Sequence, residues 1–379
     1  WNIHNEKFLK GSPFQLLKLR ASLGYLGNIS FEPYQALTMY TSLAGLNYIK
    51  GIGAVPMGIG NKNLKWERTL SANLGLDLTM FKGRWDFSAD VYVKNTDNLL
   101  LDITKAPSLG ITTSRENVGE VENHGFEFQT RVIPIKNKDW EWSLSLNYAY
   151  NKNKIKKISN ALREQNEKNQ AKGGVTPLPI YEEGQSLTAL KVVSSAGIDP
   201  ITGNEVFIKR DGSLTFVYDP NDKVVYGDTT PFGMGSLGSY LTYKQFSMGM
   251  SMRYSFGGAV YNQTLASKVE GADPRYNADE RVFSSRWKEV GQQAKYKRIS
   301  DSSVPMQTSR FVETNNYITL SSLSLAYEVP LTFIKRYGLK RLHLEMLAND
   351  LFYLSSVKRE RGLSYPYERS VEFSVRLGF

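Results

Sequence analysis

Few residues in this chain have the types and spacing that chemistry needs. None of the 379 residues is a cysteine, which excludes thiol nucleophiles, disulfides and thiolate-ligated metals. The three histidines, His4, His124 and His343, are too few and too scattered to predict a catalytic triad or a histidine metal site. The neighbouring carboxylates Glu182 and Glu183 point apart and form no acid–base pair. We therefore predict no enzyme activity, no catalytic residue and no cofactor.

Two weaker motifs have simple structural interpretations. Residues 233–238 match G-x-G-x-x-G, but a dinucleotide site needs a helix after that motif, and here a strand pattern begins near Leu237. One long segment contains five aspartates, Asp199, Asp211, Asp219, Asp222 and Asp228. Calcium binds oxygen-rich loops, but no EF-hand spacing is present, and Asp-Pro and Asp-Gly pairs favour turns. We predict turns here and no metal site.

The net charge of +10 has two candidate partners. A basic run comprises Lys152, Lys154, Lys156 and Lys157. On an outer surface the phosphates of lipopolysaccharide are the natural acidic partner, and a solvated loop base is the simpler alternative. The remaining basic residues are scattered along the chain, so nucleic-acid binding is not predicted.

The clearest pattern is strict alternation of apolar and polar residues. Between Leu70 and Met80 every second residue is apolar, and the residues between them are small or polar. Successive side chains of a strand point to opposite faces, so such a segment has one apolar and one polar face. The pattern recurs and predicts an all-β chain with about ten strands, near 17–26, 65–81, 84–97, 121–135, 139–151, 236–243, 246–257, 316–328, 340–353 and 367–379.

Short and long connections between these strands alternate. The short ones are 81–84, 136–139 and 244–245, and the long ones are about 27–63, 98–120, 156–233, 258–314 and 354–364. An antiparallel transmembrane β-barrel has this arrangement, with short periplasmic turns and long extracellular loops. No 18-residue apolar run is present to form a membrane helix. A soluble β-sandwich is the alternative, but it has no reason to collect every long loop at one end.

Aromatic residues near the short turns fit a membrane boundary. Trp85, Trp140, Tyr243 and Phe246 fall on the apolar faces beside tight turns, and Phe379 falls at the same level. Girdles of aromatic residues mark the two membrane interfaces of a barrel. We predict that these four residues contact membrane lipid. Ordinary aromatic packing inside a soluble core is the alternative.

The polar faces predict the wall of a lumen with balanced charge. Seven basic residues (Lys18, Arg20, Arg84, Lys94, Arg131, Arg253 and Arg376) face seven acidic ones (Asp77, Asp86, Asp90, Glu127, Glu141, Glu345 and Glu372). A selective pore would carry a ring of one sign, whereas a balanced wall suits a lumen that another polar domain fills. The candidates for contact with that domain are Arg20, Asp77, Asp86, Asp90, Arg131, Glu141 and Arg253.

The largest loop is rich in aromatic residues. Tyr181, Phe207, Phe216, Tyr218 and Tyr226 could stack on sugar rings or on peptide side chains of a ligand or partner. Packing of the loop onto itself explains them equally well. The segment 159–172 between the strands could form a short helix.

Several stretches together resemble one family of transporters. They are 18–24 (KLRASLG), 60–67 (GNKNLKWE), 117–127 (NVGEVENHGFE), 196–203 (AGIDPITG), 349–352 (NDLF) and 365–370 (YPYERS), with Phe379 last. Jointly they resemble the SusC/RagA family of TonB-dependent outer-membrane transporters of Bacteroidota. The resemblance extends over nearly the whole chain.

The resemblance implies more than these residues contain. Such transporters are plugged barrels of 22 strands with an N-terminal plug domain, a TonB box and a SusD-like surface lipoprotein as partner. Neither a plug nor a TonB box is found here, so we expect the chain to be the C-terminal portion of the barrel domain. The expected partners are the plug and N-terminal half of the same transporter, the TonB complex, a SusD-like lipoprotein, lipopolysaccharide and membrane lipid.

The implied function is energy-coupled import of oligosaccharides or oligopeptides across the outer membrane of a Gram-negative bacterium. The alternative is a passive porin, or the membrane anchor of a secretion or assembly complex. Phe379, an aromatic residue at the end of an alternating strand, resembles the signal read by the barrel-insertion machinery.

Overall fold

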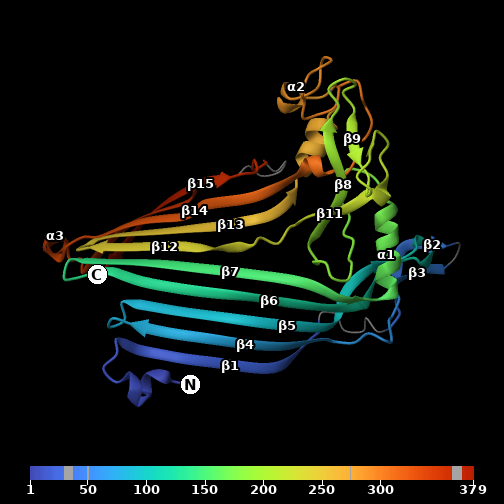
Figure 1. Ribbon diagram of the computed structural model, residues 1–379. Coiled ribbons are helices and arrows are strands. Elements are labelled where there is room, and N and C mark those ends of the chain that lie inside the picture. The colour runs from blue at the N-terminus through green and yellow to red at the C-terminus, as the bar shows by residue number, and fades with distance from the viewer. Residues whose placement is uncertain (30–36, 49–50, 274, 361–368) are drawn as a thin grey trace.

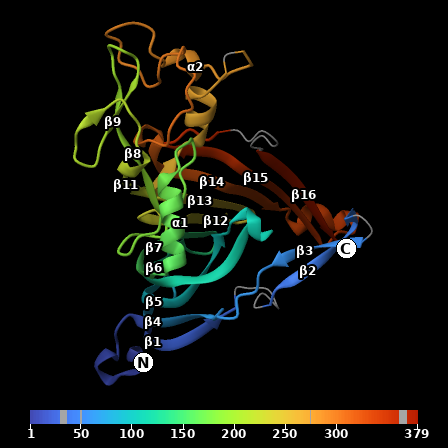
Figure 2. The same cartoon turned by 90° about the vertical axis from the view of Figure 1, so that its right-hand side faces the viewer.

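The computed structural model describes residues 1–29, 37–48, 51–273, 275–360 and 369–379. Its main element is an antiparallel sheet of ten strands whose spatial order follows the chain. They are β1 (Phe14–Asn28), β4 (Glu67–Met80), β5 (Trp85–Thr104), β6 (Thr113–Lys136), β7 (Trp140–Ile158), β12 (Gly233–Tyr243), β13 (Phe246–Tyr261), β14 (Val312–Glu328), β15 (Arg341–Ser355) and β16 (Ser370–Gly378). Seen almost end-on, these strands trace an arc from β1 to β16 (Figure 2). The all-β prediction is confirmed.

The two ends of this sheet differ (Figure 1). At the turn end, residues 81–84, 137–139 and 244–245 join neighbouring strands directly. The fourth link there, 329–340, is longer and contains α3 (Leu331–Ile334) and a 3₁₀ turn, η7 (Lys335–Tyr337). The opposite end, which we call the loop end, carries all the larger insertions.

Two insertions at the loop end, residues 159–232 and 262–311, form a folded unit that we call the crown. It contains α1 (Asn160–Ala171), α2 (Arg281–Ser284) and a second sheet in the order β10-β9-β8-β11. The strands of this sheet are β8 (Ala189–Ile198), β9 (Glu205–Ile208), β10 (Leu214–Thr215) and β11 (Lys223–Asp228). Elsewhere β2 (Met39–Tyr48) and β3 (Gly51–Gly58) form a hairpin. Short helical turns are η1 (Ile3–Asn5), η2 (Lys7–Leu9), η3 (Pro107–Leu109), η4 (Pro220–Asp222), η5 (Leu265–Glu270) and η6 (Ser309–Phe311).

The helix expected within 159–172 is present as α1, and it explains why three strands are longer than predicted. Ser159 begins it, because its side-chain oxygen accepts a hydrogen bond from the backbone N–H of Leu162. Leu162 packs with Ile103, Val118 and Ile155, which lie on the parts of β5, β6 and β7 nearest the loop end. This small core stabilises regular pairing where the sequence predicted loop.

Two predicted loops therefore need correction. The loop expected at 98–120 shrinks to 105–112, because β5 and β6 continue into it. The loop expected at 27–63 contains the β2–β3 hairpin. Parts of that loop, of the loop at 354–364, of the strand expected at 367–379 and of the motif at 365–370 lie outside the described residues.

The apolar face of the ten-stranded sheet is left uncovered by protein. Leu74 is 52% exposed, Val91 57% and Phe126 41%, although all three lie mid-strand. No core of a soluble sandwich covers these side chains in the described part of the chain. None of the described helices is long and apolar enough to cross a membrane.

Candidate functional site

A charged cluster on the polar face joins the first three strands of the sheet. The guanidinium of Arg20 on β1 donates to both carboxylate oxygens of Asp77 on β4, at 2.8 and 3.0 Å. It also donates to Asp90 on β5, at 3.1 and 3.0 Å. The guanidinium reaches Asp90 by crossing Gly75, where a Cβ would lie 2.6 Å from the Arg20 Cζ atom. The glycine is needed because any side chain there would block the crossing.

Beside this cluster a hollow of about 430 Å³ collects two more of the predicted residues. Asp86 and Arg131 line it together with Asp77. Asp86 accepts a hydrogen bond from Thr79 at 2.8 Å, whereas Arg131 forms no ion pair among the described residues. Asp77 is thus compensated by Arg20, whereas Arg131 lies opposite Asp86 in the β5–β6 ladder without a direct ion pair in the described part of the chain.

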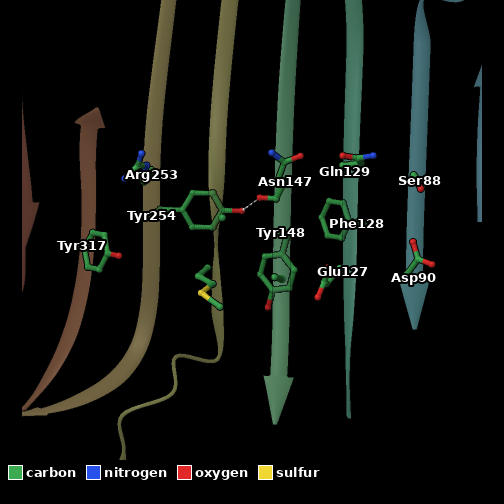
Figure 3. Close-up of a pocket in the computed structure, with 13 residues that line it drawn as sticks. Ser88, Asp90, Glu127, Phe128, Gln129, Asn147, Tyr148, Arg253, Tyr254 and Tyr317 are labelled. Atoms are coloured by element: carbon green, nitrogen blue, oxygen red, sulfur yellow. Dashed lines mark hydrogen bonds between the residues drawn. The ribbon is translucent and has the colours of Figure 1, made fainter. Parts of the chain in front are cut away.

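A larger hollow of about 570 Å³ lies further along the polar face (Figure 3). Its charged lining residues are Asp90, Glu127 and Arg253, which come from β5, β6 and β13. Arg253 forms no ion pair within the described ranges. Tyr317 of β14 and Asn147 of β7 are polar residues of the same wall.

The strand register explains why these side chains share one face. Asp90 pairs with Glu127, and Asn147 pairs with Gln129, in antiparallel ladders where directly opposed residues point the same way. The phenol of Tyr254 belongs to the alternate register and donates to the backbone oxygen of Asn147 at 2.7 Å. A lumen-facing polar wall remains our interpretation of this row.

Glu141 differs from the other six predicted wall residues. It lies at the turn end, opposite Lys136, with 3.7 Å between the ammonium and the carboxylate. Like Arg20, it lines neither of the two hollows. The ion pair with Lys136 links β6 and β7 beside their turn, and contact of Glu141 with a lumen domain stays a prediction.

The predicted girdle residues form a line on the opposite, apolar register. Trp140 pairs with Tyr243, Tyr243 with Phe246, and Phe246 with Tyr327. The Trp140 and Tyr243 rings are 4.1 Å apart, and both are more than one-third exposed. Trp85 lies at the same end and donates its indole N–H to Thr130 at 2.9 Å. Phe379, beyond β16, is 78% exposed.

In the crown a buried arginine holds the two insertions together. Arg310 donates to Glu205 of β9 twice at 2.7 Å, and to Glu270 of η5 at 2.7 and 2.8 Å. Burial by itself would lower the pKa of Arg310, but the hydrogen bonds from Arg310 to these carboxylates raise it above the ordinary value. Sequence reasoning missed this group, because its members lie 40 and 105 residues apart and no short motif joins them.

The five loop aromatics do not act as one group. Phe207, Phe216 and Tyr218 line a hollow of about 250 Å³ in the crown. Tyr181 instead packs against the core beneath α1, where burial raises its pKa. Tyr226 is exposed on β11 and does not line this hollow or either of the two hollows in the wall. Tyr181 thus packs within the loop, as the alternative expects, whereas contact of Tyr226 with a ligand or partner stays a prediction.

The weaker motifs fold as turns and strands. Residues 233–238 lie inside β12, in agreement with the strand pattern predicted there. Asp199 accepts hydrogen bonds from the N–H groups of Ile201 and Thr202, and Asp211 accepts from Ser213, as expected for turns. Within the described ranges no three carboxylates or histidines gather as a metal site.

A curved antiparallel sheet with one charged face and one exposed apolar face is the wall of an outer-membrane β-barrel. The chain belongs to the family described as TonB dependent receptor-like, beta-barrel, which it matches over residues 12–344. The predicted resemblance to SusC/RagA proteins is confirmed by its relatives.

Those relatives come from Bacteroidota and are longer than this chain. TonB-dependent receptor P3 of Formosa agariphila is 30% identical over 374 residues, covering 93% of this chain and 36% of that protein. TonB-dependent receptor SusC of Bacteroides thetaiotaomicron is 29% identical over 290 residues, covering 71% of this chain and 28% of that protein. This chain therefore spans little more than a third of the length of TonB-dependent receptor P3.

A solved structure has the same fold. The RagAB peptide importer in its closed-closed state superposes with a TM-score of 0.83 at 21% identity, covering all of this chain and 42% of that one. At this identity the likeness is one of fold.

Proposed function

We propose that the chain forms part of the barrel wall of a TonB-dependent importer that carries oligosaccharides or oligopeptides across the outer membrane. The observation that carries this proposal is the two-faced sheet. Its apolar face is left exposed for lipid, and its polar face has hollows and two guanidinium groups, those of Arg131 and Arg253, that form no ion pair with any described residue. Membership of the TonB-dependent receptor family supports it further.

The open edges of the sheet support a larger, closed barrel. In the described part of the chain β1 and β16 each have a sheet neighbour on one side only. A bilayer offers no water to satisfy free backbone groups, so a strand edge in lipid costs several kcal/mol for each unpaired group. We propose that further strands of the same transporter, in all 22, close the barrel between these edges.

Arg131 and Arg253 support a filled lumen, because unpaired guanidinium groups on the wall can bind the carboxylates of a plug domain. The TonB complex would supply energy through that plug. A SusD-like lipoprotein would cover the loop end, where the crown offers a folded surface. RagAB, whose fold this chain shares, is a peptide importer, and this keeps oligopeptides among the proposed substrates.

The first test is the intact mass and subunit composition of the complex purified from native outer membranes. We expect one polypeptide that contains this sequence together with a plug and a TonB box, bound to a surface lipoprotein. A complex without a plug or a lipoprotein would favour the second candidate, a passive porin or assembly anchor, whose support is the same two-faced sheet.

The energy requirement of uptake distinguishes an active importer from a passive porin. A strain that carries the transporter should consume a starch-derived oligosaccharide mixture or casein oligopeptides only while its TonB system is intact. Uptake that persists without TonB would refute active import. Arg253→Glu should lower uptake several-fold by adding repulsion to a wall that already carries Asp90 and Glu127. Lys138→Glu, in a tight turn, is the matched control and should leave uptake unchanged.

A further inference from the structure

A small hollow in the crown has the composition of a ligand site. Its volume is about 250 Å³, and it lies between β9 with the turn that follows it and the segment that leads from α2 toward β14. Both views place β9 and α2 near each other at the outer tip of the crown (Figures 1 and 2). The hollow is thus on the loop end, away from the wall residues already described.

One side of the hollow is aromatic, and contacts between its rings fix their positions. Phe207 is buried and meets the ring of Tyr218 edge-on, with centroids 5.5 Å apart and an interplanar angle of 78°. Phe216 is 56% exposed, so its ring face is available to a ligand. The hydroxyl of Tyr218 is buried with no hydrogen-bond partner among the described residues, which is costly unless a ligand or water completes it.

The other side is polar, and its charges are already compensated. The ammonium of Lys297, a buried residue, donates to Ser303 at 2.8 Å and pairs with Asp301 at 2.9 Å. Burial opposes ionisation of Asp301, but the hydrogen bonds from Ser303 and Lys297 hold its pKa at about 2. Glu205 shares the Arg310 guanidinium with Glu270, and the buried Arg286 interacts with Glu270 and Asp301. Three basic and three acidic groups thus balance around the site, which offers hydrogen bonds without a net charge to attract an ionic ligand.

We propose that this hollow binds one neutral sugar ring of an oligosaccharide. The apolar face of the ring stacks on Phe216, and its hydroxyls bond to the Lys297–Asp301 side. A sugar ring has this division between a C–H face and a hydroxyl edge, whereas an apolar peptide side chain would cover the partly exposed Asp301 carboxylate without offering it a hydrogen-bond donor. The hollow is sized for one ring.

A neighbouring hollow leaves room for the rest of the oligosaccharide. Asp301, Ser303 and Val304 line both the small hollow and a second one of about 550 Å³. A chain bound by one ring can therefore continue over this shared rim. The inference rests on the proposed function for the source of the sugar, but binding itself requires neither energy nor transport.

The test measures binding to the purified full transporter complex in detergent. The probes are neutral gluco-, manno- and xylo-trisaccharides and a matched series of neutral tripeptides, titrated by calorimetry and by saturation-transfer NMR. We expect at least one trisaccharide to bind, with saturation transfer strongest to its ring C–H protons. Phe216→Ala should weaken that binding about tenfold, the upper range for loss of one aromatic contact. Phe283→Ala is the control, because Phe283 of α2 is also an exposed aromatic residue of the crown but lies outside the hollow.

Three results would overturn the inference. They are the absence of trisaccharide binding, unchanged trisaccharide affinity in Phe216→Ala, and binding of the tripeptides alone. Ser303→Ala supplies a second variant that removes one acceptor of Lys297 from the polar wall, and it should also weaken trisaccharide binding. If the complex binds the trisaccharide but uptake does not depend on TonB, the proposed transport function is wrong and the proposed binding site is still supported.

Discussion

Arg310 holds two buried glutamates, and Arg310→Met is expected to open the crown while leaving the barrel wall folded. The Arg310 side chain is 10% exposed, and those of Glu205 and Glu270 are 3% and 1% exposed. Methionine preserves much of the side-chain bulk but leaves both carboxylates buried without their cation. Removing one partner from a buried ion pair typically costs about 3–5 kcal/mol. The equilibrium for crown opening should therefore shift by on the order of 10²–10⁴-fold.

Hydrogen–deuterium exchange on the full-length protein in detergent measures this opening locally. Peptides that contain β8, β9 and η5 should exchange faster in Arg310→Met, because these elements lose the link between the two insertions. Peptides from β4 and β5 serve as an internal reference, since they belong to the ten-stranded sheet. Arg275→Met is the matched control: Arg275 is 82% exposed and pairs with Asp273 at the surface.

The reasoning predicts a rescue as well as a loss. Adding Glu205→Gln and Glu270→Gln to Arg310→Met removes the uncompensated charges and should restore much of the protection of the crown peptides. Crown exchange in Arg310→Met that stays within threefold of the wild type would refute the argument that this cluster joins the insertions. So would an equal effect of Arg275→Met, because a surface pair contributes about 0–1 kcal/mol.

Three further predictions concern the crown and the end of the sheet. Burial lowers the pKa of Lys223 to about 8, so the folded crown binds this proton less tightly than the unfolded chain. The stability of the crown, measured as protection of α1 against hydrogen exchange, should therefore rise between about pH 8 and 10.5. Lys223→Met should abolish that rise. Gly203→Ala places a Cβ 2.6 Å from the Trp287 ring and should weaken protection around that tryptophan by about 1–3 kcal/mol. Gly212→Ala controls for backbone strain, since its φ is also positive and its Cβ meets nothing within 4 Å; equal losses in the two variants would refute the clash. Phe379→Ser should lower the amount of transporter in blots of fractionated outer membrane, and Phe379→Tyr should not; equal amounts would remove the proposed insertion signal.

Much of the sheet was predictable because its signal is local. Alternation with a period of two sets which side chains share a face, and it needs only neighbouring residues to be seen. That is why Asp77, Asp90 and Arg253 could be assigned to one polar set before their partners were known. The same periodicity placed Trp140 and Tyr243 on the other face, where their ring centroids are 4.1 Å apart.

The predicted strand boundaries were inaccurate where strands extend beyond their regular alternation, toward the loop end of the sheet. The polar residues of β6 and β7 near the loop end, such as Asn153, carry a weaker alternation, so those segments were interpreted as loop. They stay extended because α1 closes a small apolar core over Ile103 and Ile155. Such a core forms between segments that come into contact only on folding, so the local pattern of apolar residues cannot predict it.

The sequence by itself determined the two-faced strands, the tight turns and the side on which the long insertions lie, because each follows from the alternation and spacing of nearby residues. Only the tertiary structure decided which charges meet. Arg20 reaches Asp90 because the register puts Gly75 between them, and Arg310 finds Glu205 because two insertions fold against each other. Long-range pairing of this kind depends on register and packing, because these bring within hydrogen-bond distance residues that lie tens of positions apart in the chain.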